Sequence, residues 1–212
     1  MDEEIKQGPR MRRRSEACGK KQPGDGENAK VRNILAWVRD IGIAVVVALV
    51  LIQFVTPTIV DGSSMEPNLH DGDYLIMSKQ SYGILGGEPE YGDVVVVHTH
   101  LKDEKNHEKL IIKRVIGLPG DEITIENGTV YVNGQAQDDS YTKDQVTNGI
   151  IEGLIVPEGS IFCLGDNRLN SKDSRAADVG CISEDDIVGK VVLRLLPLNK
   201  LGTIYNPYDE QE

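Results

Sequence analysis

The sequence predicts a mostly β protein in which a compact antiparallel β-sheet domain lies behind one N-terminal transmembrane helix. Two observations lead to this fold class. The 20 residues from Ile41 to Val60 carry no formal charge, and at about 1.5 Å per helical residue they extend about 30 Å, the thickness of a bilayer's hydrocarbon core. After Val60, short apolar runs alternate with turn residues, which is typical of β-strands.

Length and composition favour one substantial domain. The chain has 212 residues, which suits one core with a tail. Aromatic residues make up 5% of the chain and the net charge is -11. Nucleic-acid binding needs a basic face and often stacking aromatic side chains. We therefore expect no nucleic-acid partner.

Residues 1–34 are predicted to be a disordered cytoplasmic tail, because their first 30 residues are rich in Gly, Lys, Arg and Glu and lack apolar periodicity. Residues 1–40 contain 10 Lys and Arg against 7 Asp and Glu, whereas residues 41–212 contain 13 against 27. Basic residues close to a membrane span favour the cytoplasmic side. We expect a single-pass protein of the cell membrane with its N-terminus in the cytoplasm and its main domain on the outer face.

Residues 35–58 are the predicted transmembrane anchor, with Trp37 at the level of the lipid headgroups and the helix ending near Pro57. A cleavable secretory signal is an alternative, but its charged leader of roughly 40 residues would be long and no Ala-x-Ala-like exit follows. A buried core helix is the other alternative, since Gln53 and the Val-rich composition would suit it.

Residues 59–212 are predicted to form the β domain. Its apolar runs are YLIMSK, DVVVVHTH, KLIIKRVIGL, EITIE, TVYVNG, LIVPEG, SIFCLGD and IVGKVVLRLLPL. Asn127-Gly128 predicts a two-residue hairpin turn between EITIE and TVYV, and Asn133-Gly134 ends the next strand. The polar run from His98 to Lys109 is expected to be an exposed loop between two buried strands.

Three clusters of residues contain chemically capable side chains. VDGSSMEPNL, residues 60–69, presents a serine on a Gly/Ser turn, but a serine hydroxyl needs a neighbouring base to become a nucleophile. KLIIKRVIGLPGD, residues 109–121, places Lys113 inside an apolar strand, where desolvation by about 3 pKa units, or about 4 kcal/mol, would make it a base at neutral pH. GDNRLNSKDSR, residues 165–175, is a polar loop directly after a strand. Taken singly, they also fit an ordinary turn, a solubilising lysine and a structured loop.

Together and in this order behind one N-terminal span, GSSMEPNL, KRVIGLPGD and GDNRLNSKDSR resemble the bacterial type I signal peptidases, the serine-lysine enzymes that remove signal peptides from exported proteins. The resemblance covers roughly residues 35–198. It implies that Ser64 is the nucleophile and Lys113 the general base of a membrane-bound serine endopeptidase without metal or cofactor. Its implied partners are the lipid bilayer and secretory preproteins with small residues before the cleavage site, with no obligate partner chain.

The resemblance also assigns supporting roles. Ser171 would hydrogen-bond and orient the Lys113 amine, while Asp173 and Arg175 would form an ion pair that holds the third cluster near the site. Two further groups follow from the matching motifs: structural support from Gly165, Asp166, Asn167 and Arg168, and a shallow apolar pocket for a small P1 side chain from Val60, Met65, Leu69 and Ile112.

Two positions depart from the family pattern. Some members have a serine two positions before the nucleophile, whose hydroxyl helps to stabilise the oxyanion, and this chain has Gly62 there. The second oxyanion donor is therefore unassigned, at a kind of site where losing one donor costs about 10²–10³ in rate. Asn68 stands where the family usually has threonine, a change beyond the reacting atoms.

Other functions have weaker support in the sequence. A serine-histidine catalyst could use His70, His98, His100 or His107, but none shares a motif with Ser64. His98 and His100 could bind zinc on one strand face, but no third ligand is clear. Self-cleaving serine-lysine repressors would carry a DNA-binding domain in place of the apolar span, and a catalytically silent membrane-anchored binding module remains an alternative. Two separate thiols are favoured over a disulfide between Cys163 and Cys181.

Overall fold

The computed structural model describes residues 25–82, 87–102 and 108–209. The chain divides into two units, with the boundary between Val47 and Ala48, and all the strands lie in the second unit. The elements are helix α1 (Asp25–Phe54), strands β1 (Val55–Ile59), β2 (Tyr74–Ser78), β3 (Val94–Lys102), β4 (Glu108–Gly117), β5 (Glu122–Glu126), β6 (Thr129–Val132), β7 (Gln135–Ala136), β8 (Ile151–Ile155), β9 (Ser160–Leu164), β10 (Ile182–Ser183), β11 (Ile187–Leu196) and β12 (Gly202–Thr203), and the short 3₁₀ helices η1 (Arg168–Asn170), η2 (Glu184–Asp186) and η3 (Leu198–Lys200).

Helix α1 differs from the expected anchor at both ends. It begins at Asp25, so the prediction of disorder is wrong for residues 25–34, while residues 1–24 lie outside the described residues. Glu, Ala, Lys and Arg in the segment ENAKVR near its start have high helix propensity, so a helix can begin here without apolar periodicity. Within the described part of the chain, no helix combines the length and the apolarity needed to span a bilayer.

The end of the apolar run is a strand. Helix α1 ends at Phe54, three residues before Pro57, and Val55–Ile59 pairs with β2 as an edge strand of the sheet. Four of the five residues in VTPTI are β-branched, which favours extended backbone, and an edge strand tolerates the missing N–H of its proline. The last four residues of the 35–58 segment therefore belong to a strand of the β domain.

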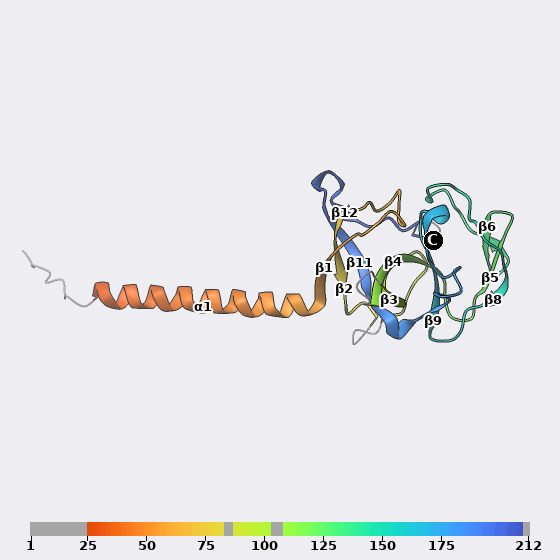
Figure 1. Cartoon of the computed structure of the whole chain (residues 1–212). Coiled ribbons are helices and arrows are strands. Elements are labelled where there is room, and N and C mark those ends of the chain that lie inside the picture. Colours follow the sequence, from red (N-terminus) through yellow and green to blue (C-terminus); the bar gives the residue numbers. More distant parts are fainter. Residues whose placement is uncertain (1–24, 83–86, 103–107, 210–212) are drawn as a thin grey trace, which may run out of the picture. The chain divides into compact units, whose positions relative to one another are not determined.

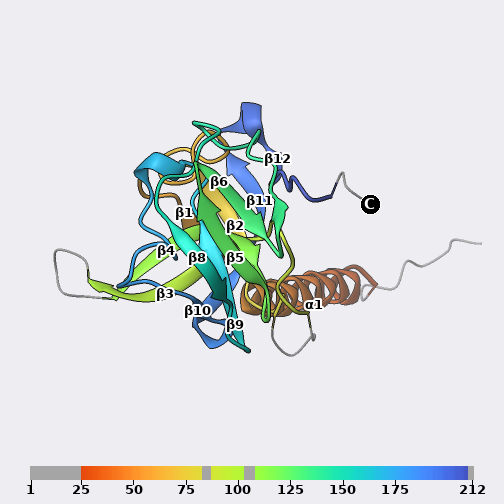
Figure 2. The same ribbon diagram turned by 90° about the vertical axis from the view of Figure 1, so that its right-hand side faces the viewer.

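The β domain consists of two antiparallel sheets, which confirms the mostly β prediction. The large sheet has the strand order β1-β2-β11-β3-β4-β9-β10, with β12 paired to β11, and the small sheet has the order β7-β6-β5-β8. Figure 1 shows β5, β6 and β8 gathered at one end of the domain and β1, β2 and β11 at the other. In Figure 2 the small sheet faces the viewer.

Both predicted Asn-Gly turns are confirmed. Glu126 pairs with Thr129 across Asn127-Gly128, and Val132 pairs with Gln135 across Asn133-Gly134. The loop predicted for residues 98–109 is wrong at its two ends, because β3 extends to Lys102 and β4 begins at Glu108; residues 103–107 lie outside the described residues. The polar residues of these strand ends pair across β3 and β4, and His98 and His100 point their side chains to solvent.

The core on one face of the large sheet determines where the first motif lies. Met65 and Leu69 are 1% and 0% exposed and pack with Leu75, Val94 and Val96. At about 25 cal/mol per Å² of buried apolar surface, side chains of this size contribute about 1.5–3 kcal/mol each when fully buried. The turn after β1 is thereby held against the sheet by its own side chains.

Candidate active site

The turn that carries Ser64 follows β1 directly. Val60 closes it through reciprocal backbone hydrogen bonds, its N–H to the Asp73 carbonyl and its carbonyl from the Gly72 N–H, each 3.0 Å. Gly62 has a φ of 97°, a conformation that favours glycine, and its N–H donates to Asp71 Oδ1 at 2.8 Å. Within the described residues, the Ser64 N–H donates to no acceptor. The turn thus presents both the hydroxyl and the N–H of Ser64 for chemistry.

Lys113 of β4 meets Ser64 at hydrogen-bond distance. Its Nζ lies 2.7 Å from Ser64 Oγ and 2.8 Å from the Ile112 carbonyl oxygen, to which it donates. The lysine is 2% exposed. The predicted nucleophile and base, 49 positions apart in the sequence, are therefore adjacent in space.

Burial changes the acid-base chemistry of Lys113. Desolvation disfavours the ammonium form and lowers the pKa of Lys113 from 10.5 to about 8, although the carboxylates of Asp173 and Asp166 act in the opposite direction. A neutral amine beside a serine hydroxyl can accept its proton, which an ordinary surface lysine cannot do at neutral pH. The geometry and the lowered pKa together fit the expected roles of a nucleophile and its base.

Gly165 allows the third motif to approach Ser64. A Cβ placed on Gly165 would lie 2.5 Å from the Ser64 carbonyl oxygen and 2.3 Å from Ser171 Oγ, distances that no side chain could occupy. The glycine at the end of β9 is therefore required for close contact between the loop and the catalytic turn.

Asn167 and Asn170 of the third motif hold the turn through hydrogen bonds to Ser63 and Ser64. The Asn167 N–H donates to the Ser64 carbonyl and its Nδ2 to the Ser63 carbonyl, both at 3.0 Å. Asn170 Nδ2 donates to Ser63 Oγ, also at 3.0 Å. Asn167 thus holds the backbone of Ser63 and Ser64 directly, and Asn170 makes a contact that the sequence analysis did not identify.

Asp166 belongs to a buried ion pair with Arg114. Arg114 Nε and Nη2 donate to the two carboxylate oxygens at 2.9 and 2.8 Å, and the two side chains are 0% and 1% exposed. Asn68 Nδ2 also donates to Asp166, at 2.8 Å. Asn68 therefore connects the turn that carries Ser64 to the third motif, and Arg114, the residue after Lys113, is a supporting residue that the motifs alone did not reveal.

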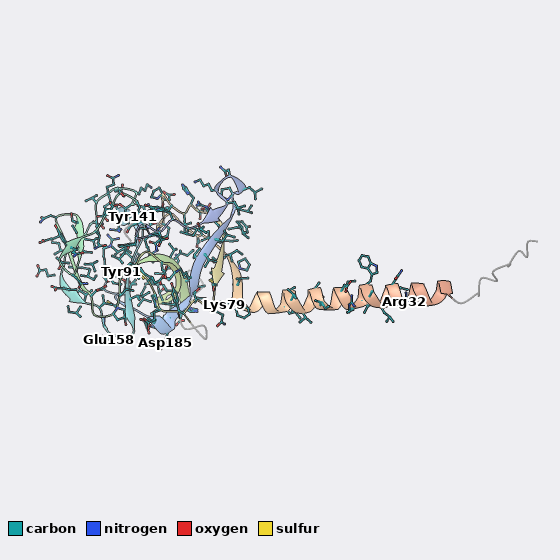
Figure 3. All side chains as sticks on the ribbon, turned by 180° about the vertical axis from the view of Figure 1, so that it is seen from behind. Arg32, Lys79, Tyr91, Tyr141, Glu158 and Asp185 are labelled. Carbon is teal, nitrogen blue, oxygen red and sulfur yellow. The ribbon has the colours of Figure 1, made fainter. Side chains whose placement is uncertain are left out.

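Arg168 is held in a second buried polar cluster. Its guanidinium donates to Asp139 Oδ1 at 2.9 Å, to Thr147 Oγ1 at 2.6 Å and to the Tyr141 hydroxyl at 2.9 Å. The Tyr141 ring, labelled in Figure 3, also lies 5.1 Å from the Arg114 guanidinium carbon, so two cations flank one aromatic ring. These contacts connect the third motif to the segment that follows the small-sheet strand β7.

Asp173 and Arg175 form the expected ion pair. Arg175 Nε and Nη2 donate to the two oxygens of Asp173 at 2.7 and 2.8 Å, and Asp173 Oδ2 accepts from the Gly165 N–H at 3.0 Å. Burial acts to raise the pKa of Asp173, but the Arg175 guanidinium and the Gly165 N–H outweigh it, so that the pKa is lowered. The ion pair and the Gly165 contact of this carboxylate close the loop.

The expected hydrogen bond between Ser171 and Lys113 is absent. The Ser171 Oγ is buried and has no hydrogen-bond partner among the residues that the structure describes. The Lys113 amine is instead oriented by Ser64 and the Ile112 carbonyl, and Ser171 lies over Gly165. The role expected for Ser171 from the resemblance therefore has no hydrogen bond to support it among the described residues.

A groove of about 570 Å³ opens beside Ser64. Of the four predicted pocket residues, Val60, Met65 and Ile112 line it, whereas Leu69 does not, because it is packed in the core and 0% exposed. The other lining residues are Thr58, Ile59, Asp61, Gly62, Ser63, Ser64, Val96, Leu101, Lys102, Lys109, Leu110, Ile111, Lys113, Asn170 and Lys172.

Two unpaired strand edges border this groove. β1 pairs only with β2, and β4 pairs with β9 only from Arg114 onward, so residues 108–113 have one strand neighbour within the described part of the chain. Unpaired N–H and C=O groups on a strand edge bind extended peptides by forming a further strand. The groove therefore has the geometry of a peptide-binding cleft ending at Ser64.

The alternative sites have little structural support. His98 and His100 are exposed on β3, and His107 lies outside the described residues. No group of three or more His, Cys, Asp or Glu side chains in the described ranges could hold a metal ion. Cys163 and Cys181 are both free thiols, as favoured from the sequence.

The chain matches a family model and individual known proteins. The model of the family described as signal peptidase, peptidase S26, matches residues 34–196. The chain is 37% identical over 194 residues to signal peptidase IB of Staphylococcus aureus, covering 83% of this chain and 96% of that protein. It is 36% identical over 182 residues to signal peptidase I T of Bacillus subtilis, covering 81% and 90%. A crystal structure of a signal peptidase I from Enterococcus faecalis aligns with 49% of this chain and 96% of its own, at 27% identity and a TM-score of 0.39.

Proposed function

Because the chain belongs to the signal peptidase family, peptidase S26, we propose that it is a membrane-bound serine endopeptidase that removes N-terminal signal peptides from exported preproteins. In this proposal Ser64 is the nucleophile and Lys113 the general base. The observation that carries it is the 2.7 Å contact between Lys113 Nζ and Ser64 Oγ at the end of a peptide-sized groove.

The substrate binds as an extended strand between the unpaired edges of β1 and β4, with its scissile carbonyl beside Ser64 Oγ. The groove walls near Ser64 include Val60, Met65 and Ile112, all apolar and close-packed, so a small side chain before the cleavage site fits best. Main-chain hydrogen bonds supply affinity independent of sequence, which suits an enzyme with many preprotein substrates.

Acylation of Ser64 begins with transfer of its hydroxyl proton to Lys113. Neutral Lys113 takes the proton of the Ser64 hydroxyl while Oγ forms a bond to the scissile carbonyl carbon, and the Ser64 N–H donates to the oxyanion that results. Lys113 then gives the proton to the departing nitrogen as the C–N bond breaks. The mature protein leaves with its new amino terminus, and the signal peptide remains as an ester on Ser64.

Deacylation uses the same base. Lys113 takes a proton from a water molecule as the water attacks the ester carbonyl, and it returns a proton to Ser64 Oγ when the ester bond breaks. The carboxylates of Asp166 and Asp173 are already paired with arginines, so they hold the loops in place.

From its sequence, the apolar segment Ile34 to Phe54 is the proposed membrane anchor; the proposal goes beyond the described residues, among which no spanning helix is found. These 21 residues would extend about 32 Å as a helix, and their only charged side chains, Arg39 and Asp40, form an ion pair at 2.8 Å near the basic end. The excess of basic residues before this segment favours a cytoplasmic N-terminus and a catalytic domain on the outer face. The full chain should sediment with membranes and resist extraction by high salt.

Cleavage of an Ala-x-Ala precursor by the full chain in detergent tests the function. We expect the variants Ser64→Ala and Lys113→Ala to lose activity, while Ser140→Ala and Lys79→Ala, matched changes at exposed positions, keep it. Undiminished cleavage by either active-site variant would overturn the proposal.

A further inference from the structure

We propose that Ser63, the residue before the nucleophile, is a second catalytic serine: its hydroxyl donates to the oxyanion, and Asn170 is the positioning residue that aims it. The inference rests on the proposed function, because it requires acylation at Ser64. It assigns the donor that Gly62 cannot provide.

The site needs a second donor. Negative charge develops on the scissile carbonyl oxygen during acylation, and enzymes of this kind stabilise it with preorganised donors. The Ser64 N–H is one donor. Gly62 has no side chain, and its N–H is already bonded to Asp71 Oδ1 at 2.8 Å, so neither group of Gly62 is free for the oxyanion.

Ser63 is placed where that donor would be needed. It lines the groove beside Ser64, and its Oγ is separated from the Ser64 nitrogen by only four covalent bonds, so one oxygen atom can lie within reach of both donors. Its backbone is fixed by two hydrogen bonds to its carbonyl, from Asn167 Nδ2 at 3.0 Å and from the Glu66 N–H at 3.2 Å. A hydroxyl on this backbone has little freedom beyond rotation of its own side chain.

Asn170 determines which role the hydroxyl can take. Its Nδ2 donates to Ser63 Oγ at 3.0 Å, and an amide nitrogen can only donate. A serine hydroxyl has one hydrogen to donate and two acceptor sites, and the contact with Asn170 occupies an acceptor site. Within the described residues, the Ser63 hydroxyl donates to no acceptor. Its hydrogen is therefore available to a substrate oxygen in the groove, which Asn170 also lines.

The contact with Asn170 also strengthens the Ser63 hydroxyl as a hydrogen-bond donor. Accepting a hydrogen bond from Asn170 polarises the Ser63 O–H and makes it a stronger donor. Ser63 and Asn170 would then act as a chain, with Asn170 donating to Ser63 and Ser63 donating to the oxyanion. A role for Asn170 in packing alone would not require its amide nitrogen to point at a hydroxyl.

Steady-state kinetics on the full chain, with an Ala-x-Ala precursor peptide and at the alkaline plateau of the pH profile, tests the proposal. For Ser63→Ala we expect kcat to fall about 10²–10³-fold with KM changed less than about threefold, because the donor acts mainly in the transition state. Ser63→Thr keeps the hydroxyl and should restore kcat to within about tenfold of the parent. Ser140→Ala, an exposed serine whose hydroxyl bonds Asp138 in its own turn, is the matched control.

The variant Asn170→Asp tests whether Asn170 orients the Ser63 hydroxyl toward the oxyanion. A carboxylate would accept the Ser63 hydrogen and withdraw it from the oxyanion, so we expect a kcat loss like that of Ser63→Ala. In the double variant Ser63→Ala, Asn170→Asp the losses should not multiply, because both remove one donor. If the two losses multiply, Asn170 does not act through Ser63 and its positioning role is overturned.

The remaining outcomes separate the two proposals. Activity in Ser64→Ala would overturn the proposed function itself. An inactive Ser64→Ala together with a parental kcat for Ser63→Ala would overturn only the role of Ser63. A loss of kcat in Ser63→Ala that Ser63→Thr does not restore, accompanied by a lower Tm, would show that Ser63 is structural and would also overturn its role.

Discussion

The pH dependence of cleavage follows from the burial of Lys113. Only its neutral form can take the Ser64 proton, and burial lowers its pKa from 10.5 to about 8. At pH 7 about one tenth of the enzyme then holds a neutral lysine, against about one part in 3,000 at the ordinary pKa, an advantage of about 300-fold. In the proposed mechanism, this advantage is what the burial of Lys113 contributes to the rate at neutral pH.

Measurement of kcat/KM from pH 5.5 to 10 tests this expectation. The precursor peptide should be soluble and contain no group that titrates in this range. We expect kcat/KM to increase with pH, because Lys113 loses its proton and becomes able to act as a base. We expect about a tenfold rise per pH unit below pH 7 and a plateau above about pH 9. A rate that still rises tenfold per unit at pH 10, or one that is flat from pH 6 to 8, would refute the reasoning.

Three further predictions concern residues around the pair. Lys113→Met should raise the free energy of unfolding at pH 7 by up to about 3 kcal/mol, because the folded protein no longer buries an ammonium; the gain should shrink between pH 8 and pH 10.5, as measured by urea unfolding. Asp166→Asn should destabilise the protein by about 3–5 kcal/mol, because Arg114 would remain buried without a counter-charge; an unchanged Tm would contradict this. Gly165→Ala should lower kcat about 10²-fold, since the new methyl group displaces Ser171 and the catalytic turn; parental activity would show that the loop adapts without cost.

The sheet could be predicted from local sequence because its strands have local signals. Alternating apolar runs and the two Asn-Gly turns define β5 and β6 to the residue or nearly so. β1 could not be predicted in this way, since Val55–Ile59 continues an uncharged apolar run and periodicity does not separate a short strand from the end of a helix. The pairing with β2 decides its conformation, and that pairing is not local.

The contacts of the site likewise lack local signals in the sequence. The proximity of Ser64 and Lys113 was expected from the three motifs taken together, and no periodicity in either segment reveals it. The ion pair of Arg114 with Asp166 joins residues 52 positions apart, and the contact of Asn68 with Asp166 spans 98, so neither has a local signal. Ser171 was misjudged in its contact because the direction of a hydroxyl in a loop depends on backbone geometry that a motif does not specify.

Direct observation of the covalent intermediate tests the central claim most directly. The full chain, mixed with an Ala-x-Ala precursor peptide and quenched in acid within one turnover, can be digested and analysed by mass spectrometry. The account predicts the signal-peptide fragment as an ester on Ser64, absent from Ser64→Ala and greatly diminished in Lys113→Ala. Precursor cleavage that proceeds without any adduct on Ser64, or with the adduct on another residue, would contradict it.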